Sequence, residues 1–168
     1  RSGWGDTVAA ASAAIGVLFC GLTLFTGSVW GRPTWNTYWD WGDVRLVTTL
    51  ILFLMMIGYL SVRSIGGDER TVATRSAVVG VLAAALIPVV NRSVEWWENN
   101  TLHQKSSLTD GKLEDLTLVT LVVGFVVWGL FFVWAMIHRF RIAWLERELA
   151  GADLDEAIEA RRAEGAVT

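Results

Sequence analysis

Large aromatic rings and charged side chains are crowded into one short stretch, residues 31–46, which reads GRPTWNTYWDWGDVRL. A second stretch, residues 91–104, reads NRSVEWWENNTLHQ and adds two adjacent tryptophans and a histidine. Indole rings offer flat apolar area, a polar N–H group and a preference for offset stacking, and arginines pair with carboxylates in a fixed geometry. The candidate binding residues are therefore Arg32, Trp35, Tyr38, Trp39, Trp41, Asp43, Arg45, Trp96, Trp97 and His103.

A flat, partly anionic ligand would suit these residues, and haem has both properties because an apolar macrocycle carries its propionates. Its iron needs an axial donor, and imidazole is a common one. The chain has two histidines, of which His103 lies among the aromatic stretches and His138 ends the last apolar block. An interfacial position is the simpler interpretation of His138. The residues alone leave two interpretations of His103, an iron ligand or a surface histidine, and tryptophans are also common at membrane interfaces.

Four apolar blocks must position these residues. No charged residue occurs between Asp6 and Arg32, Arg45 and Arg63, Arg75 and Arg92, or Asp115 and Arg139. A helix needs about 20 apolar residues to span a bilayer, and 53% of this chain is hydrophobic. The sequence therefore predicts an all-α, polytopic transmembrane bundle with four spans, near residues 8–26, 46–62, 74–90 and 116–137. A water-soluble bundle is disfavoured because the blocks are apolar all round rather than on one face.

The basic residues predict which way the chain faces. Four spans place the amino terminus, the middle loop and the tail on one side, and that side is rich in arginine: Arg1, Arg63, Arg70, Arg75, Arg139, Arg141, Arg147, Arg161 and Arg162. The positive-inside rule makes this side cytoplasmic. The tryptophan-rich loop 27–45 and the histidine-bearing loop 91–115 then face outward.

Two domains follow from this arrangement, a transmembrane haem-handling domain over residues 1–140 and a cytoplasmic helical tail over residues 141–168. We expect Gly151 to interrupt the tail. The tail suits either a solvated helix or a docking segment for a partner. The single cysteine, Cys20, lies inside the first predicted span, so neither a disulfide framework nor a cysteine-based metal site is predicted.

The stretch GSVWGRPTWNTYWDWGDVRL, residues 27–46, resembles the tryptophan-rich motif of the haem-handling membrane proteins of cytochrome c maturation, the WWD family of the CcsA superfamily. NRSVEWWENNTLHQ is similar to the second signature of its CcmC branch, cytochrome c maturation protein C. The two motifs occur in the family's order with a pair of spans between them. The likeness covers about residues 15–140 and leaves the tail outside.

The resemblance implies a haem-transfer subunit rather than an enzyme. Such a subunit holds haem b transiently on the outer face of the plasma (inner) membrane and loads it onto the haem chaperone CcmE. It further implies as partners an ABC-type ATPase with its membrane subunits, the small membrane subunit CcmD and membrane lipid, with no nucleic acid. Two axial histidines, one on each side of the tryptophan motif, serve as iron ligands in that family. Carried over to this chain, the motif's tryptophans correspond to Trp35, Trp39 and Trp41, and Tyr38 stands where tryptophan is common. The acidic and basic residues at the end of the motif correspond to Asp43 and Arg45, and the second axial histidine corresponds to His103.

This sequence departs from the family pattern in three respects. Gly42 is inserted before Asp43, and Glu98 and Asn99 are additional residues in the second signature. Either Asp40 or Asp43 could therefore take the role of the family's aspartate. No histidine precedes the tryptophan-rich motif, although the first axial histidine of the family does. Because the family has six spans, we expect residues 1–168 to be the last four spans of a longer protein, or one half of a split one.

Two other functions remain open at this stage. One is a haem synthetase that attaches haem to apocytochrome thiols, against which the TLHQ signature of residues 101–104 argues. The other is a permease-like transporter subunit. A transport path predicts ionisable residues within the spans, and none of the four blocks contains a charged residue.

Overall fold

The computed structural model describes residues 3–104 and 114–165, and throughout these residues the chain forms helices and short connections without a strand. The helices are α1 (Gly3–Trp35), α2 (Val44–Ser64), α3 (Glu69–Trp96), the short 3₁₀ helix η1 (Glu98–Asn100) and α4 (Asp115–Gly165). The predicted all-α fold class is confirmed. Residues 105–113 of the expected outer loop lie outside the described residues.

Four helices are long and apolar enough to cross a membrane: Trp4–Trp35, Val44–Ser64, Arg70–Trp96 and Asp115–Ala163. Each predicted span lies within one of them. Their most apolar segments are almost entirely exposed, with at most 11% of the residues buried inside the molecule. Helices that are apolar all round and yet unburied require an apolar medium. The chain is therefore a multi-pass membrane protein.

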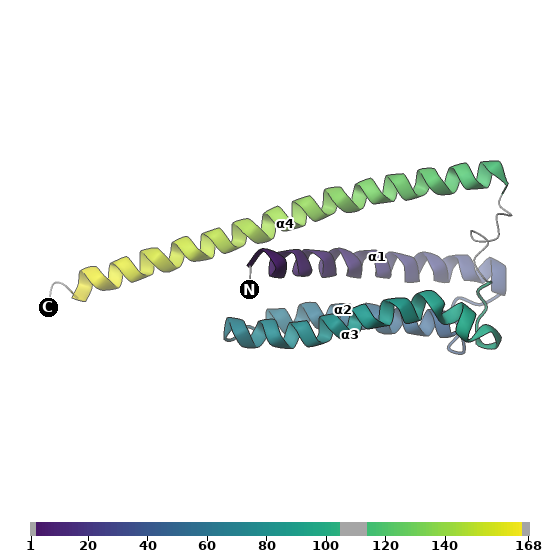
Figure 1. Ribbon diagram of the computed structural model, residues 1–168, viewed down its shortest axis with the longest axis horizontal. Coiled ribbons are helices and arrows are strands. Elements are labelled where there is room, and N and C mark those ends of the chain that lie inside the picture. The colour runs from purple at the N-terminus through teal and green to yellow at the C-terminus, as the bar shows by residue number, and fades with distance from the viewer. Residues whose placement is uncertain (1–2, 105–113, 166–168) are drawn as a thin grey trace.

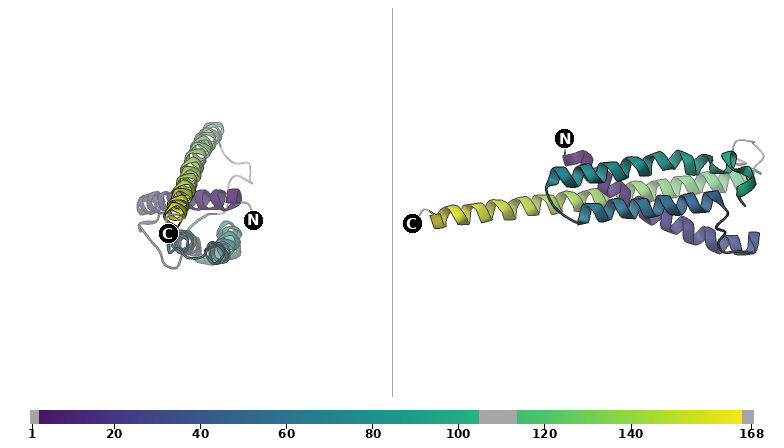
Figure 2. Two further views of the ribbon diagram at one scale, coloured as in Figure 1. Left: turned by 90° about the vertical axis from the view of Figure 1, so that its left-hand side faces the viewer. Right: turned by 90° about the horizontal axis from the view of Figure 1, so that it is seen from below.

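The helices α1, α2 and α3 pack side by side, whereas α4 contacts α1 and diverges from the others along its length (Figures 1 and 2). Glycines let α1 approach α2 closely, because a Cβ atom at Gly16 would lie 3.0 Å from the Met56 sulfur and one at Gly21 would lie 3.3 Å from the Phe53 ring. Small residues at helix interfaces have this effect in membranes generally. Aromatic contacts join α4 to α1, with the Phe19 ring 5.7 Å from the Trp128 ring.

Two tight connections turn the chain between α1, α2 and α3. The α2–α3 turn contains Gly66 and Gly67, both with positive φ, a conformation that glycine adopts without steric cost. Asp68 then caps α3 by accepting a hydrogen bond from the Thr71 amide. This turn lies at one end of the bundle, and the ends of α1 and α3 lie together at the other (Figure 1).

Two helix boundaries differ from those expected. The first nine residues of the expected outer loop, 27–35, belong to α1, so this helix extends past the predicted end of the span. The helix α4 also continues through Gly151 to Gly165 without a break. A glycine inside a helix costs only about 1 kcal/mol relative to alanine, and the alanines, leucines, glutamates and arginines around Gly151 favour helix strongly enough to offset it. The expected interruption at Gly151 was wrong.

A cluster of charged side chains ties three helices together at the end that holds the α2–α3 turn. Arg63 of α2 donates two hydrogen bonds to the Asp6 carboxylate of α1, at 2.5 and 2.7 Å. Arg147 of α4 donates to the same carboxylate at 2.5 Å. Charged groups near a bilayer are stabilised when they pair with one another. These contacts hold α4 in position in addition to its aromatic contacts with α1.

Candidate functional site

The end of α1 determines where the tryptophan-rich stretch leaves the bundle. Asn36 adopts a left-handed conformation with φ of 57°, which commonly ends a helix. Arg32 stabilises this turn by donating hydrogen bonds to the Asn36 backbone carbonyl at 2.7 Å and to its side-chain oxygen at 2.8 Å. The Arg32 guanidinium also lies 5.6 Å from the centre of the Tyr38 ring. The predicted binding residues Arg32 and Tyr38 therefore shape the loop.

The residues after Asn36 form a compact loop rather than a further helical turn. The Thr37 hydroxyl donates to the Trp39 carbonyl at 2.9 Å, and the Asp40 carboxylate accepts from the Gly42 amide at 2.8 Å. Trp35 and Trp39 consequently do not share a helical face, because α1 ends at Trp35. The chain after α1 is therefore a bent loop that carries Trp39 and Trp41.

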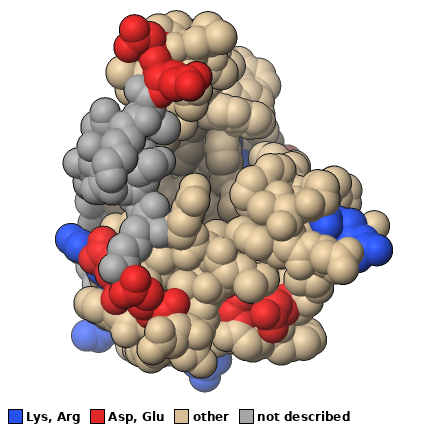
Figure 3. Space-filling view, turned by 90° about the vertical axis from the view of Figure 1, so that its right-hand side faces the viewer, with Lys and Arg blue, Asp and Glu red and all other residues tan. Residues whose placement is uncertain are grey.

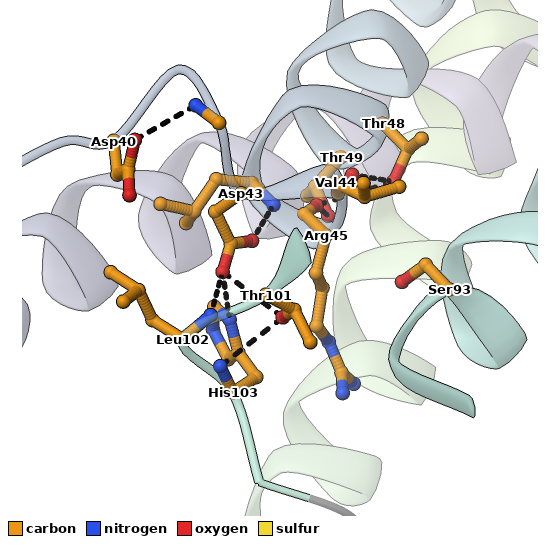
Figure 4. Close-up of polar contacts among 12 residues, drawn as sticks. Asp40, Asp43, Val44, Arg45, Thr48, Thr49, Ser93, Thr101, Leu102 and His103 are labelled. Carbon is orange, nitrogen blue, oxygen red and sulfur yellow. Dashed lines mark hydrogen bonds and ion pairs between the residues drawn. The ribbon is translucent and has the colours of Figure 1, made fainter. Parts of the chain in front are cut away.

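Asp43 is the most buried charged residue of this region, with only 1% of its surface exposed. It caps α2, because its Oδ1 atom accepts a hydrogen bond from the Leu46 amide at 2.8 Å. Its Oδ2 atom accepts from the Thr101 hydroxyl at 3.0 Å and the Leu102 amide at 2.6 Å, and lies 3.2 Å from Nδ1 of His103. Figure 4 shows these partners converging on one carboxylate.

These contacts determine the charge state of Asp43. Burial by itself would raise the pKa of this carboxyl group, but the hydrogen bonds donated to it, above all those from the amides of Leu46 and Leu102, lower the pKa below its usual value. A carboxylate that accepts several hydrogen bonds is stabilised in its ionised form. Asp43 is therefore a buried anion at neutral pH.

The end of α3 brings His103 to this anion. The Trp97 amide donates to the Ser93 carbonyl and ends α3, and η1 leads into an extended Thr101. The Thr101 hydroxyl oxygen accepts a hydrogen bond from the His103 amide at 3.1 Å. The His103 side chain keeps 25% of its surface exposed, and its ring centre lies 4.8 Å from that of Trp35 at 60°. The imidazole is thus held between a carboxylate and an indole ring.

The four remaining tryptophans of the predicted site form two pairs. The rings of Trp39 and Trp41 lie 5.5 Å apart, and those of Trp96 and Trp97 lie 5.8 Å apart. Trp30, which sequence reasoning did not include in the site, packs edge-on against Trp35 at 5.1 Å. Trp30 lies five positions before Trp35, outside the three- or four-residue spacing at which side chains share a helix face, so its place in the run of tryptophans was the available signal. Figure 3 looks onto this end, where uncharged side chains make up most of the described surface.

Two polar groups in the site have no side-chain partner within the part of the chain that the structure describes. The Arg45 guanidinium makes no hydrogen bond or ion pair with the described residues, and Figure 4 shows its side chain extending beside Thr101. The Nε1 atom of Trp39 is buried and has no hydrogen-bond partner among the residues described. A buried N–H group without a partner is costly. Both groups are suited to an anionic or polar ligand at this end of the bundle.

The donor set suits haem better than a free metal ion. Within residues 3–104 and 114–165, no group of three or more histidine, cysteine or carboxylate side chains could hold a metal ion. Haem iron already has its porphyrin nitrogens as ligands and needs only axial donors from the protein. A single imidazole, partly exposed beside indole rings, can supply one axial donor. His138, in contrast, packs on Trp134 within α4, with ring centres 4.5 Å apart.

The sequence comparisons agree with these features. The family model described as Heme exporter protein C matches residues 1–154. The Heme exporter protein C of Bradyrhizobium diazoefficiens is 37% identical over 155 residues, which cover 90% of this chain and 58% of that protein. The protein of the same name from Haemophilus influenzae is 36% identical over 146 residues, 82% of this chain and 56% of that protein. A mitochondrial ccmC-like protein of Marchantia polymorpha, named for cytochrome c biosynthesis, is 43% identical over 98 residues, 58% of this chain and 39% of that protein.

The match to the family extends over both aromatic motifs, the first three membrane-capable helices and most of the fourth. This chain spans somewhat more than half the length of the bacterial relatives that it matches. The family is described as a heme exporter, which is a transport component. From the extent of this match, together with the helical membrane fold, the chain belongs to the Heme exporter protein C family.

Proposed function

We propose that this chain binds haem b transiently on the outer face of the membrane and delivers it to a haem chaperone during the biogenesis of c-type cytochromes. The observation that carries this proposal is the position of His103, whose partly exposed imidazole lies beside Trp35 and contacts the buried Asp43 carboxylate. Such an imidazole is suited to be an axial ligand of iron. Haem would leave chemically unchanged, so the chain acts in transfer and not as an enzyme.

The surrounding residues have separate parts in this proposal. The indole rings of Trp35, Trp39 and Trp41, with the adjacent pair Trp96 and Trp97, provide the apolar surface on which the macrocycle rests. The guanidinium of Arg45, which has no partner among the described residues, is available to a propionate. Arginine pairs with carboxylates through parallel hydrogen bonds. Arg32 is already bonded to Asn36, so its part is to hold the loop.

The outer location rests on the distribution of charge. The end opposite the haem site holds the α2–α3 turn with Arg63, Arg70 and Arg75 close to it. Short loops rich in arginine stay on the cytoplasmic side of plasma membranes. The tryptophan-rich end then faces outward, where c-type cytochromes are assembled. The partners that the family resemblance implies, CcmE, an ABC-type ATPase with its membrane subunits, and CcmD, belong to this proposal.

A transport path through the spans has less support. Ser76 and Ser93 are buried between helices, but each hydroxyl donates to a carbonyl of its own helix, that of Val72 at 2.8 Å and that of Val90 at 2.8 Å. Hydroxyl groups satisfied in this way do not mark a polar pathway. The ion pairs of Asp6 lie at the end of the bundle rather than midway across it.

The experiment compares His103→Ala with His138→Ala in the full-length protein, co-expressed with its haem chaperone. The His103 variant is expected to lose most of its haem and to load little onto the chaperone, because it lacks the proposed axial donor. The His138 variant is expected to resemble the wild type. Haem is measured by the pyridine haemochrome assay and the visible spectrum. Normal occupancy and normal chaperone loading in the His103 variant would refute the proposal.

A further inference from the structure

We propose that Asp43 is the positioning residue of the haem site: its carboxylate accepts a hydrogen bond from Nδ1–H of His103 and thereby presents Nε2 of the same ring to the haem iron. This inference rests on the proposed function, because it concerns how the chain prepares its axial ligand. It assigns Asp43 a role that none of its three other contacts requires. It also identifies Asp43, rather than Asp40, as the aspartate coupled to His103.

The first step is the position of the proton on the imidazole. An ionised carboxylate has no hydrogen to donate and only accepts hydrogen bonds. Three other groups, the amides of Leu46 and Leu102 and the hydroxyl of Thr101, are placed to donate to the Asp43 carboxylate. The fourth partner, Nδ1 of His103, lies 3.2 Å from Oδ2. Two acceptors cannot form a hydrogen bond with each other, so Nδ1 carries the proton in this contact.

The second step concerns Nε2, the other nitrogen of the His103 ring. A neutral imidazole with a hydrogen on Nδ1 has its lone pair on Nε2. In proteins, histidines that bind metals almost always donate the other ring N–H to a carboxylate, a carbonyl or water, and this contact fixes the tautomer and raises the basicity of the ligand. The contact between His103 and Asp43 is such an arrangement. It holds the ring ready for iron before any ligand arrives.

The third step is the rigidity of the arrangement. Asp43 is 1% exposed and begins α2, so its backbone is part of a helix terminus. Thr101 links the two partners, because its hydroxyl donates to Asp43 and accepts from the His103 amide. On the other side of the ring lies Trp35, at 4.8 Å. The imidazole is therefore restrained on two sides by α1 and α2 as well as by its own loop.

Asp40 provides the matched comparison. It is an acidic residue in the same loop, three positions earlier, and its Oδ1 atom accepts from the Gly42 amide at 2.8 Å. Figure 4 shows its carboxylate directed to this turn and away from His103. Replacement by asparagine keeps the shape of either side chain but removes the charge, and asparagine is as good an N-cap as aspartate. The two variants therefore separate the contact with His103 from general effects on the loop.

The first measurement uses haem. In full-length protein carrying Asp43→Asn, haem affinity is expected to fall about 10- to 100-fold, as it does on loss of comparable partners of metal-binding histidines. The reduction potential of the bound haem is expected to rise as well, because an imidazole that has lost its carboxylate partner stabilises ferric iron less. Asp40→Asn is expected to match the wild type in both. An unchanged potential and affinity in Asp43→Asn would overturn the inference.

The second measurement needs neither haem nor the Asp43→Asn variant. Nitrogen-15 NMR of histidine-labelled, haem-free, full-length protein reports which ring nitrogen of each histidine carries the proton. The signal of His103, assigned with the His103→Ala variant, is expected to show Nδ1 protonated and Nε2 bare. A proton on Nε2 in the neutral ring would overturn the inference even if Asp43→Asn fails to fold. Retention of haem by His103→Ala would instead count against the proposed function, so the two failures are distinguishable.

Discussion

At the scale of single residues, the proposed haem site is a set of contacts between positions that are far apart in the sequence. Trp35 ends α1, Asp43 begins α2 and His103 follows α3. The residue types were predictable, because indole, imidazole and arginine side chains are those that suit haem. The contact between Asp43 and His103 was not predictable, because it spans 60 positions and because Gly42 and the additional residues Glu98 and Asn99 obscured the register of both motifs.

Trp35 offers a test at this scale. Trp35→Leu is expected to weaken haem binding about two- to tenfold, because aromatic contacts of this kind contribute about 0.5–1.5 kcal/mol beyond burial of their area. The ring of Trp35 restrains His103 at 4.8 Å, whereas Trp144 bonds to Glu148 in the C-terminal part of α4. Trp144→Leu is therefore the control. Titration of the full-length protein with haem gives both affinities, and equal values for the two variants would contradict this role of Trp35.

At the scale of helices, the sequence predicts the number and nature of the elements well but their ends less well. The four spans were recognisable because long, uncharged apolar blocks are typical of membrane-spanning helices. The extension of α1 to Trp35 was missed because the outer loop was predicted to begin at residue 27, where the first span had already reached the length that a bilayer requires. The helix in fact ends where Asn36 takes up a left-handed conformation, stabilised by Arg32. Such an end depends on a side-chain contact that composition does not reveal.

The packing of α1 on α2 gives a prediction for these elements. A Cβ atom at Gly21 would lie 3.3 Å from the Phe53 ring, and nothing lies within 4 Å of the corresponding position at Gly124 in α4. Gly21→Val is expected to lower stability by about 1–3 kcal/mol, the usual cost of overpacking an interface. Gly124→Val is expected to have a much smaller effect. Thermal unfolding in detergent measures both, and an equal loss for the two variants would show that the close approach of α1 and α2 is not needed.

At the scale of the whole molecule, α4 is much longer than a membrane is thick. Its 51 residues correspond to about 75 Å of helix, whereas the apolar core of a bilayer is about 30 Å thick. In Figures 1 and 2 the C-terminal part of α4 extends past the ends of the other helices. The contact of Arg147 with Asp6 lies where this part begins to leave the bundle. A single carboxylate thus joins the long helix to α1 and, through Arg63, to α2.

Loss of this carboxylate tests its part in holding α4. Asp6→Asn is expected to free the C-terminal part of α4 and to increase the rate of tryptic cleavage at Arg147 several-fold, because a protease needs locally loosened chain. Glu148→Gln is the control, since Glu148 accepts a hydrogen bond from Trp144 within the same helix. Mass spectrometry of timed digests in detergent identifies the cleaved bonds. Equal cleavage rates in the wild type and Asp6→Asn would indicate that the Asp6 carboxylate is not needed to hold α4.

The Asp43 carboxylate has a consequence for how this membrane protein can vary in length. It joins the residue before α2 to Thr101 and Leu102 after α3, so its hydrogen bonds connect the start of α2 to the end of α3. One full turn added to only one of these two helices would shift its end by about 5.4 Å relative to the other helix and would break these hydrogen bonds. An insertion or deletion in α2 should therefore be tolerated only with one of equal length in α3.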